Sequence, residues 1–327
     1  MIVHAQKCQT LKKGKLLKMN KKIIFELDSL YRDHMRVTGY EFGSGEKSAC
    51  IVGAMRGNEM QQLYCCSKLI KRLKEIEKEG MITPGKSILV IPCVNSSSMN
   101  IEKRFWGTDN TDINRMFPGY SLGETTQRIA GAVFDAISDY TYGMQFVSSY
   151  VPGKYIPHIR MMKTGFESPV MAAAFCLPYV VIREPKPYDT TTLNYNWQLW
   201  NCHAFSIYTD ATEQIHEESA TEAVESILRF LKMGNVLQEN TPVTGKVSKP
   251  EMILESEETI VKTKKAGFLR LKKDIGMQVK EGEVIAEIIH TYEGNCIEEV
   301  KAPKAGTIFY ICQRPVVYSN FEICKII

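Results

Sequence analysis

The apolar residues of this 327-residue chain follow two alternating patterns between residues 20 and 240. Short uninterrupted apolar runs predict buried strands, at 48–53, 87–94, 177–182 and 203–208. Apolar residues spaced by three and four predict amphipathic helices, at about 58–79, behind 124–128 and at 217–232. The positions expected to face inward are Leu63, Cys66, Ile70, Leu73, Ile76, Ile129, Val133, Phe134, Ile137, Ala220, Ala223, Val224, Ile227, Leu228 and Leu231. The alternation predicts an α/β domain over 21–240, with a mixed sheet and helices on both faces.

The pattern changes to short strands near the C-terminal end. Residues 241–255 begin with Thr-Pro-Val-Thr-Gly and are expected to form a linker. Two segments of 256–327, residues 276–285 and 300–308, resemble the halves of a lipoyl/biotinyl-like β-sandwich. Carriers of that type modify a Lys in the hairpin between the halves, but 292–296 contains none. The small all-β domain is therefore expected to cover a cleft of the larger domain or to support a homo-oligomer.

The N-terminal residues, the longest apolar stretch and the cysteines restrict the class of protein to which this chain can belong. Residues 1–20 match no predicted element and are expected to form a mobile extension, with Met19 as an alternative start. The first residues lack the apolar core of a signal peptide, and the apolar stretch at 168–182 is too short to span a membrane. Ten scattered cysteines without a Cys-x-x-Cys pair fit a reducing compartment, so a cytoplasmic protein is expected.

Charge argues against a nucleic-acid partner. The formal net charge is only +4, and the basic residues are interspersed with acidic ones. A basic run at 262–265 keeps that class from being excluded.

The polar and aromatic stretch 188–197 has no clear periodicity and predicts a loop, in which Tyr195 or Trp197 packs either on a ligand or in the interior.

Candidate chemistry follows two of the predicted strands. Strand 48–53 runs into Gly53-Ala-Met-Arg-Gly-Asn-Glu59, at the place where open α/β sheets bind ligands. After strand 87–94 come Asn95, Arg104 and the segment 109–119, Asp-Asn-Thr-Asp-Ile-Asn-Arg-Met-Phe-Pro-Gly. Taken alone, the first segment also fits an ordinary strand–turn–helix connection with a surface Arg and Glu.

Read together, these segments resemble the succinylglutamate desuccinylase/aspartoacylase family, the zinc-carboxypeptidase-like amidohydrolases that cut small N-acyl amino acids. Members carry a Gly-x-His-Gly-Asp/Asn-Glu turn and later an Asp-x-Asn-Arg-x-Phe-Pro-Gly loop, which is nearly complete here. The resemblance implies zinc held by the His and Glu of the turn and by a second His on a later strand. It also implies a general base in a Glu-x-Gly step.

Carried over residue by residue, the metal site is altered. Arg56 stands at the first His, Glu59 keeps the Glu, and Gln145 falls on the second His, while Tyr208 occupies the place of the general base. Arg has no lone pair to offer a metal, and an amide oxygen is a poor replacement for imidazole. Tyr, with an unperturbed pKa of about 10, is a weak base. Zinc is thus expected from the resemblance but is predicted to be absent or weakly bound here.

The substrate-binding part of the resemblance is retained. Asn114, Arg115 and Arg104 match positions that grip a substrate carboxylate, and Arg suits that task because its fork makes two parallel hydrogen bonds. Arg56, paired with Glu59, would add a third cation where zinc would supply charge. For each Arg, a surface or capping salt bridge is the alternative.

Two functions stay open at this point. One is a hydrolase of small N-acyl amino acids that uses other residues or another metal position, such as His158 and His203 with Glu59, for which the sequence has no signature. The other is a non-catalytic, metal-free protein that binds a small carboxylate-bearing ligand. A thiol nucleophile at Cys202 is disfavoured, because adjacent strand residues point to opposite faces.

Overall fold

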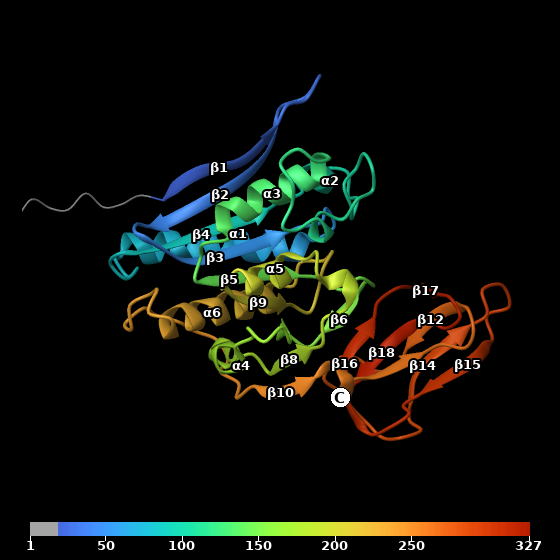
Figure 1. The fold of residues 1–327 in the computed structure, drawn as a ribbon. Helices are drawn as coiled ribbons and strands as arrows, with labels where there is room; N and C mark the ends of the chain where they lie inside the picture. Colours follow the sequence, from blue (N-terminus) through green and yellow to red (C-terminus); the bar gives the residue numbers. More distant parts are fainter. Residues whose placement is uncertain (1–18) are drawn as a thin grey trace, which may run out of the picture.

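A computed structural model describes residues 19–327, so most of the segment expected to form an extension lies outside the described residues. A nine-stranded mixed sheet organises the larger domain (Figure 1). In spatial order its strands are β1 (Asn20–Leu27), β2 (Met35–Gly43), β4 (Lys86–Cys93), β3 (Glu46–Ala54), β5 (Tyr142–Val147), β9 (His203–Tyr208), β7 (His158–Met162), β8 (Tyr179–Arg183) and β10 (Glu251–Leu254). Strands β3, β4, β5 and β9 run parallel, whereas β1, β2 and β7 introduce antiparallel pairs.

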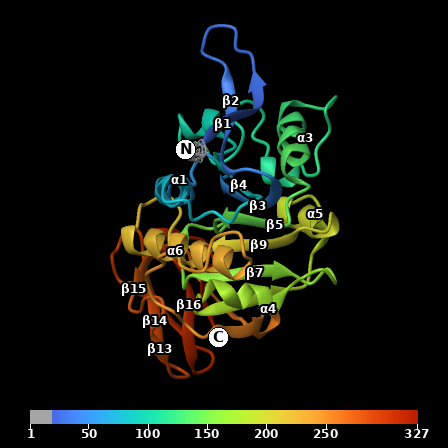
Figure 2. The ribbon, with the colours of Figure 1, turned by 90° about the vertical axis from the view of Figure 1, so that its left-hand side faces the viewer.

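Helices cover both faces of this sheet, as the alternating pattern predicts. Figure 2 shows α1 and α6 on one side and α3 and α5 on the other. Two separate apolar clusters result, one under each pair of helices. The helices are α1 (Met60–Lys78), α2 (Ser96–Met99), α3 (Thr125–Ile137), α4 (Pro169–Ala172), α5 (Leu193–Leu199) and α6 (Glu217–Met233), with 3-10 turns at Ile113–Arg115, Ala173–Phe175, Pro187–Asp189 and Glu255–Glu257. The predicted α/β fold class is confirmed.

The predicted inward faces of the long helices are buried, with one partial exception. Leu63 is only half-buried, whereas the other inward positions of α1, α3 and α6 are buried.

The predicted loop at 188–197 is wrong in part, because it contains most of α5. Leu193 and Trp197, one helical turn apart, are both fully buried, and the Trp197 indole N–H donates to the Ile137 carbonyl at 3.2 Å. Trp197 thus packs in the interior rather than on a ligand.

The C-terminal segment forms the expected small all-β sandwich around its own apolar cluster. One sheet contains β11 (Thr259–Lys262), β18 (Glu322–Ile326), β16 (Gly306–Cys312) and β13 (Gln278–Val279); the other contains β15 (Cys296–Lys301), β14 (Val284–Ile289), β12 (Gly267–Leu271) and β17 (Val316–Val317). The segment 292–296, at the β14–β15 connection, is where a carrier domain would need its Lys.

Backbone pairing ties the two domains together. Strand β6 (Gly153–Tyr155), from the larger domain, pairs with β16 of the sandwich. Strand β10 lies within the expected linker 241–255 but joins the main sheet beside β8. At Gly153 an added Cβ would lie 2.4 Å from the Tyr310 ring and 2.7 Å from the Ile311 carbonyl oxygen, so only glycine allows β6 to approach β16 this closely.

A buried aromatic cluster fills the junction beside β6. The His158 ring stacks on Tyr208, with centroids 4.6 Å apart and planes 8° from parallel, and also contacts Tyr155 and Phe309. Nδ1 lies 2.8 Å from the Ile156 carbonyl oxygen, so Nδ1 carries the proton and donates, which leaves Nε2 unprotonated. Burial, with the nearby Arg160 charge, lowers the pKa of His158 well below its usual value. His158 is therefore neutral in the folded protein.

We expect Gly153→Ala to lower the free energy of unfolding by about 1–3 kcal/mol, because the new methyl group overpacks the β6–β16 contact. Urea denaturation monitored by circular dichroism measures the change. Lys154→Ala, the next residue on the same strand, is the matched control and should cost less, since its ion pair with Asp274 is partly exposed. Equal losses in the two variants would contradict the packing argument.

We expect His158 to make the protein less stable in acid. Its pKa is lower in the folded than in the unfolded state, so the unfolded chain binds the extra proton first. Stability falls as pH drops below the unfolded pKa of about 6.5, by up to about 1.4 kcal/mol per pH unit for one group. The replacement His158→Phe should flatten the plot of unfolding free energy against pH in that window. Replacing the half-exposed His290 by Gln should not, and identical slopes for His158→Phe and the unchanged protein would refute the assignment.

Candidate functional site

A cavity of about 570 Å³ lies at the carboxyl ends of β3, β5 and β9 and extends to the C-terminal domain. The structure brings the sequence-predicted site residues together there. Six of them contribute to its wall, namely Arg56, Arg104, Asn114, Arg115, Gln145 and Tyr208. Glu59, the seventh, is fully buried and contacts Arg56. Their convergence fits the residue correspondence, while their roles stay predictions.

Glycines shape the turn that presents Arg56. A Cβ at Gly57 would lie 2.2 Å from the Lys103 carbonyl oxygen, and one at Gly53 would lie 2.3 Å from the Pro92 carbonyl oxygen. The turn is therefore held against both the loop after α2 and the end of β4, and a larger side chain at either glycine would push it away. This packing fixes where the chain enters α1 and directs the Arg56 side chain to the cavity wall.

Arg56 forms a buried ionic triad with two carboxylates. Its Nη1 donates to Glu59 Oε1 at 3.1 Å, while Nε and Nη2 donate to Asp112 Oδ2 at 3.1 and 2.9 Å. Burial alone would lower the pKa of Arg56, but the two carboxylates outweigh it and raise that pKa, so the guanidinium stays charged. The pairing with Glu59 was expected from the sequence. The pairing with Asp112 was not.

Glu59 has no free face for another ligand. Its Oε2 accepts from the backbone N–H groups of Met55 and Arg56, at 2.8 and 3.0 Å. Its Oε1 accepts from Arg56 and from the Ser148 hydroxyl, the latter at 2.6 Å. With four donors and no exposed surface, this carboxylate is satisfied by the protein.

Neutral amides occupy the neighbouring part of the wall. Gln145 Nε2 donates to Asn114 Oδ1 at 3.4 Å, and Gln145 Oε1 accepts from Asn194 Nδ2 at 2.9 Å. Asn194 also donates to the Ser206 hydroxyl at 2.7 Å, which links β5 to β9 through side chains. Gln145 therefore uses its amide for internal hydrogen bonds and is almost fully buried.

These residues do not fit a zinc ion. A zinc site needs His, Cys or carboxylate atoms converging on one point, with a position left for water in a hydrolase. Here a guanidinium, a satisfied carboxylate and an amide stand together. The alternative set of His158, His203 and Glu59 does not converge within residues 19–327, where metal-capable groups come together at Glu26, Asp28 and His34 instead.

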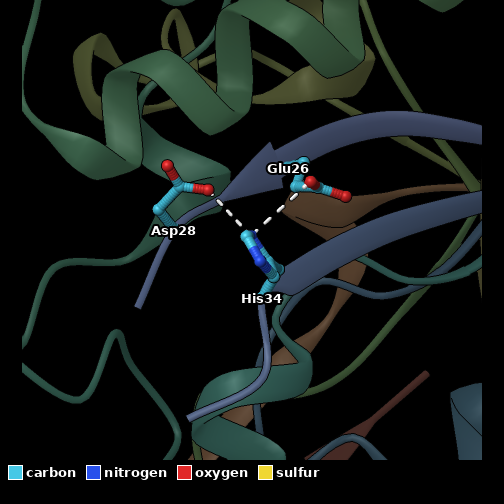
Figure 3. Close-up of side chains that lie close together, drawn as sticks. All are labelled: Glu26, Asp28 and His34. Carbon is cyan, nitrogen blue, oxygen red and sulfur yellow. Dashed lines mark hydrogen bonds and ion pairs between the residues drawn. The ribbon is translucent and has the colours of Figure 1, made fainter. Parts of the chain in front are cut away.

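The Glu26–Asp28–His34 group, shown in Figure 3, is exposed and does not contribute to the cavity wall. His34 Nδ1 lies 2.7 Å from Asp28 Oδ1 and 3.6 Å from Glu26 Oε1. Glu26 also pairs with Arg36, and this contact lowers the pKa of Glu26. A guanidinium bound to one of the carboxylates competes with a metal cation, so these contacts describe a surface ion-pair network on the β1–β2 hairpin.

Arg104 and Arg115 differ in how their charge is balanced. Arg115 Nη1 donates to the Tyr188 carbonyl at 2.6 Å and lies 3.4 Å from Asp189 Oδ1. Arg104 has no carboxylate within 4 Å among the described residues, and its Nε is buried without a partner. Burial and the Arg56 charge lower the pKa of Arg104. Between residues 19 and 327, Arg104 is thus a cation without a carboxylate counter-ion.

Tyr208 is in direct contact with the guanidinium of Arg160. Arg160 Nη1 donates to the Tyr208 hydroxyl oxygen at 3.0 Å, and the guanidinium carbon lies 4.4 Å from the ring centroid. Arg160 thus holds the Tyr208 phenol in place through both its hydroxyl oxygen and its ring.

Several residues of the site, in the cavity wall or in contact with Arg56, were missed by the sequence analysis. Asp112 could have been found, because it lies in the same segment as Asn114 and Arg115. Ser148 follows directly on β5, one residue beyond its end. No periodicity signals the others, which are Arg160, Arg183, Asp189, Glu255 and Lys325.

Comparison with known proteins agrees with the fold and the motifs. An N-alpha-acetyl-L-2,4-diaminobutyric acid deacetylase from Halomonas elongata is 22% identical over 300 residues, covering 83% of this chain and 79% of the deacetylase. A succinylglutamate desuccinylase structure from Silicibacter sp. TM1040 superimposes with a TM-score of 0.79 at 17% identity, with 94% of each chain covered. The product-bound ectoine utilization protein from Ruegeria pomeroyi gives 0.77 at 15% identity, again with 94% of each chain covered.

At such identities, likeness to solved structures establishes the fold alone. The assignment beyond the fold comes from residues 46–233, which match the model of the succinylglutamate desuccinylase/aspartoacylase catalytic domain. None of the helices between residues 19 and 327 is long and apolar enough to cross a membrane. Since the match spans more than half of the chain, this protein belongs to the succinylglutamate desuccinylase/aspartoacylase family.

Proposed function

We propose that this protein is a metal-free, carboxylate-binding member of its family that has lost zinc-dependent amide hydrolysis. The observation that carries the proposal is the triad of Arg56, Glu59 and Asp112, which includes two of the positions that the sequence resemblance assigns to metal ligands. Without a metal, no group in the wall lowers the pKa of a bound water, which is how such hydrolases generate hydroxide near neutral pH.

The ion pairs of the site favour Arg104 and Arg115, rather than Arg56, as the source of the positive charge that binds the ligand. Arg56, paired with Glu59, was expected to add a third cation where zinc would supply charge. It faces two carboxylates instead, so the triad carries a formal charge of −1 and contributes no net attraction for an anion. Arg104 without a counter-ion, together with Arg115 and Asn114, is better suited to hold a carboxylate.

Asn114 and Arg115 keep donors directed to the cavity. Asn114 Oδ1 accepts from Gln145 Nε2 and from the Leu193 backbone N–H, at 3.4 and 3.3 Å, so its carbonyl end is fixed inward. The amide nitrogen then points away from these contacts and is available to a ligand. Arg115 uses Nη1 for Tyr188 and Asp189, which leaves Nε and Nη2 for a bidentate contact. A cytoplasmic location and a small-molecule partner, with neither membrane nor nucleic acid bound, belong to the same proposal.

We expect the unchanged protein to contain zinc only at background after dialysis, whereas the double variant Arg56→His/Gln145→His should hold about one zinc per chain. The two imidazoles supply the missing donors, and removal of the guanidinium frees Oε1 of Glu59. Inductively coupled plasma mass spectrometry measures the metal, and zinc-dependent stabilisation against heat confirms specific binding. The single variant Gln145→His, which retains Arg56, is the control and should stay at background. One tightly held zinc in the unchanged protein would refute the proposal.

We expect Arg115→Gln to weaken the binding of small carboxylates about tenfold or more, because charge-assisted hydrogen bonds to the ligand are lost. Isothermal titration calorimetry with monocarboxylates measures this. Arg270→Gln, on an exposed strand of the C-terminal domain, is the matched control and should bind like the unchanged protein.

In parallel, N-acyl amino acids incubated with the metal-free protein should release no free amine. Sustained turnover would favour the alternative hydrolase that uses other residues.

A further inference from the structure

Each of the two guanidinium groups proposed to hold the carboxylate lies over a tyrosine ring. The guanidinium carbon of Arg104 is 5.5 Å from the ring centroid of Tyr150, and that of Arg115 is 5.3 Å from the ring centroid of Tyr188. All four side chains line the cavity. Arg104 also lies 5.7 Å from the ring centroid of Phe105, which is not part of the wall. Separations below about 6 Å are typical of cation–π contacts, in which the face of the ring attracts the cation.

The two tyrosines are exposed, so they do not fill the apolar core. Tyr150 lies in the connection between β5 and β6 and is 77% exposed, while Tyr188 lies in the 3-10 turn Pro187–Asp189 and is 54% exposed. An exposed ring adds little to folding stability, because the hydrophobic gain comes from area removed from water. Two such rings on the cavity wall, each beside a ligand-binding cation, therefore favour a role in binding.

A guanidinium can contact a ring and a carboxylate at the same time. Its N–H donors lie in the plane of the group and reach a carboxylate at the edge, whereas an aromatic ring occupies a face. Arg104 has no carboxylate counter-ion among residues 19–327. Arg115 uses Nη1 for the Tyr188 carbonyl and for Asp189, so Tyr188 contacts this side chain through both its backbone and its ring. The remaining donors of both arginines stay available to a ligand.

We propose that Tyr150 and Tyr188 are positioning residues of the carboxylate site, Tyr150 acting through Arg104 and Tyr188 through Arg115. Each ring restricts the rotation of its long arginine side chain, so that less rotamer freedom is lost when the ligand binds. Each ring also excludes water from one side of the ion pair between arginine and ligand, and charges attract more strongly where water is excluded. This inference rests on the proposed carboxylate-binding function and extends it.

A double-mutant cycle tests whether each tyrosine acts through its arginine. In calorimetric titrations of the full chain with a monocarboxylate, Tyr150→Ala should weaken binding about threefold or more. In the background of Arg104→Gln the same replacement should cause no further loss, whereas in the background of Arg115→Gln the whole loss should remain. The variant Tyr188→Ala should show the reverse dependence on the two arginines. Tyr292→Ala, at a position 95% exposed on the C-terminal domain, is the matched control and should bind like the unchanged protein.

Two further readouts separate an aromatic contact from a merely bulky neighbour. Tyr150→Phe keeps the ring and should retain most of the affinity, whereas Tyr150→Leu keeps only apolar bulk and should not. Loss of the ring opens the ion pair to solvent, so the affinity of Tyr150→Ala should fall more steeply with added sodium chloride than that of the unchanged protein. Both tyrosines are exposed, so these variants should unfold at the temperature of the unchanged protein.

The outcomes distinguish this inference from the proposed function. If Arg104→Gln and Arg115→Gln weaken binding but Tyr150→Ala and Tyr188→Ala do not, the positioning role is refuted and carboxylate binding stands. The role is also refuted if Tyr150→Ala costs as much without Arg104 as with it, or if Tyr150→Leu binds like the unchanged protein. If no monocarboxylate binds, or if neither arginine replacement changes the affinity, the proposed function fails as well.

Discussion

The architecture of the cavity depends on the ionic triad of Arg56, Glu59 and Asp112. Three charged side chains are removed from water at the end of β3, and such burial is costly unless each charge meets its opposite with good geometry. Here the guanidinium fork bonds to both carboxylates, and Glu59 is completed by two backbone N–H groups and a serine hydroxyl. Loss of Arg56 would leave two carboxylates without a compensating cation. The triad therefore fixes the turn at Arg56 and the loop at Asp112 with respect to one another.

The second constraint is the shared wall between the two domains. Strand β6 pairs with β16, and Lys325 of the sandwich lies 5.9 Å from the ring centroid of Tyr155, which belongs to the aromatic cluster around His158. Because this cluster is neutral and close-packed, the cations beside it are held in a region where charge interactions are screened less than at the surface. The sandwich is thus a structural part of the cavity and not an appended module.

Much of the fold was predictable from the sequence because periodicity reports burial. The strand at 203–208 and the helix at 217–232 have regular apolar patterns, and both form with nearly the expected bounds. By contrast, α5 depends on two buried residues among amides, and its short length gives no periodicity to read. The pairings of β6 and β10 with distant strands are long-range contacts, which local patterns do not encode.

The residues of the candidate site that belong to a sequence motif were predictable from the sequence. The ion pairs that these residues form in the folded chain were not. Arg56 and Asp112 are separated by 56 positions, and only the folded chain brings them together. That contact changes the chemical reading: a lone Arg in place of a metal ligand would be a free cation, whereas an Arg between two carboxylates is neutralised. The two acids, in turn, would repel one another if no cation stood between them. The guanidinium thus holds two converging carboxylates together. Unlike a metal ion, a guanidinium offers neither an open coordination position nor a polarised water.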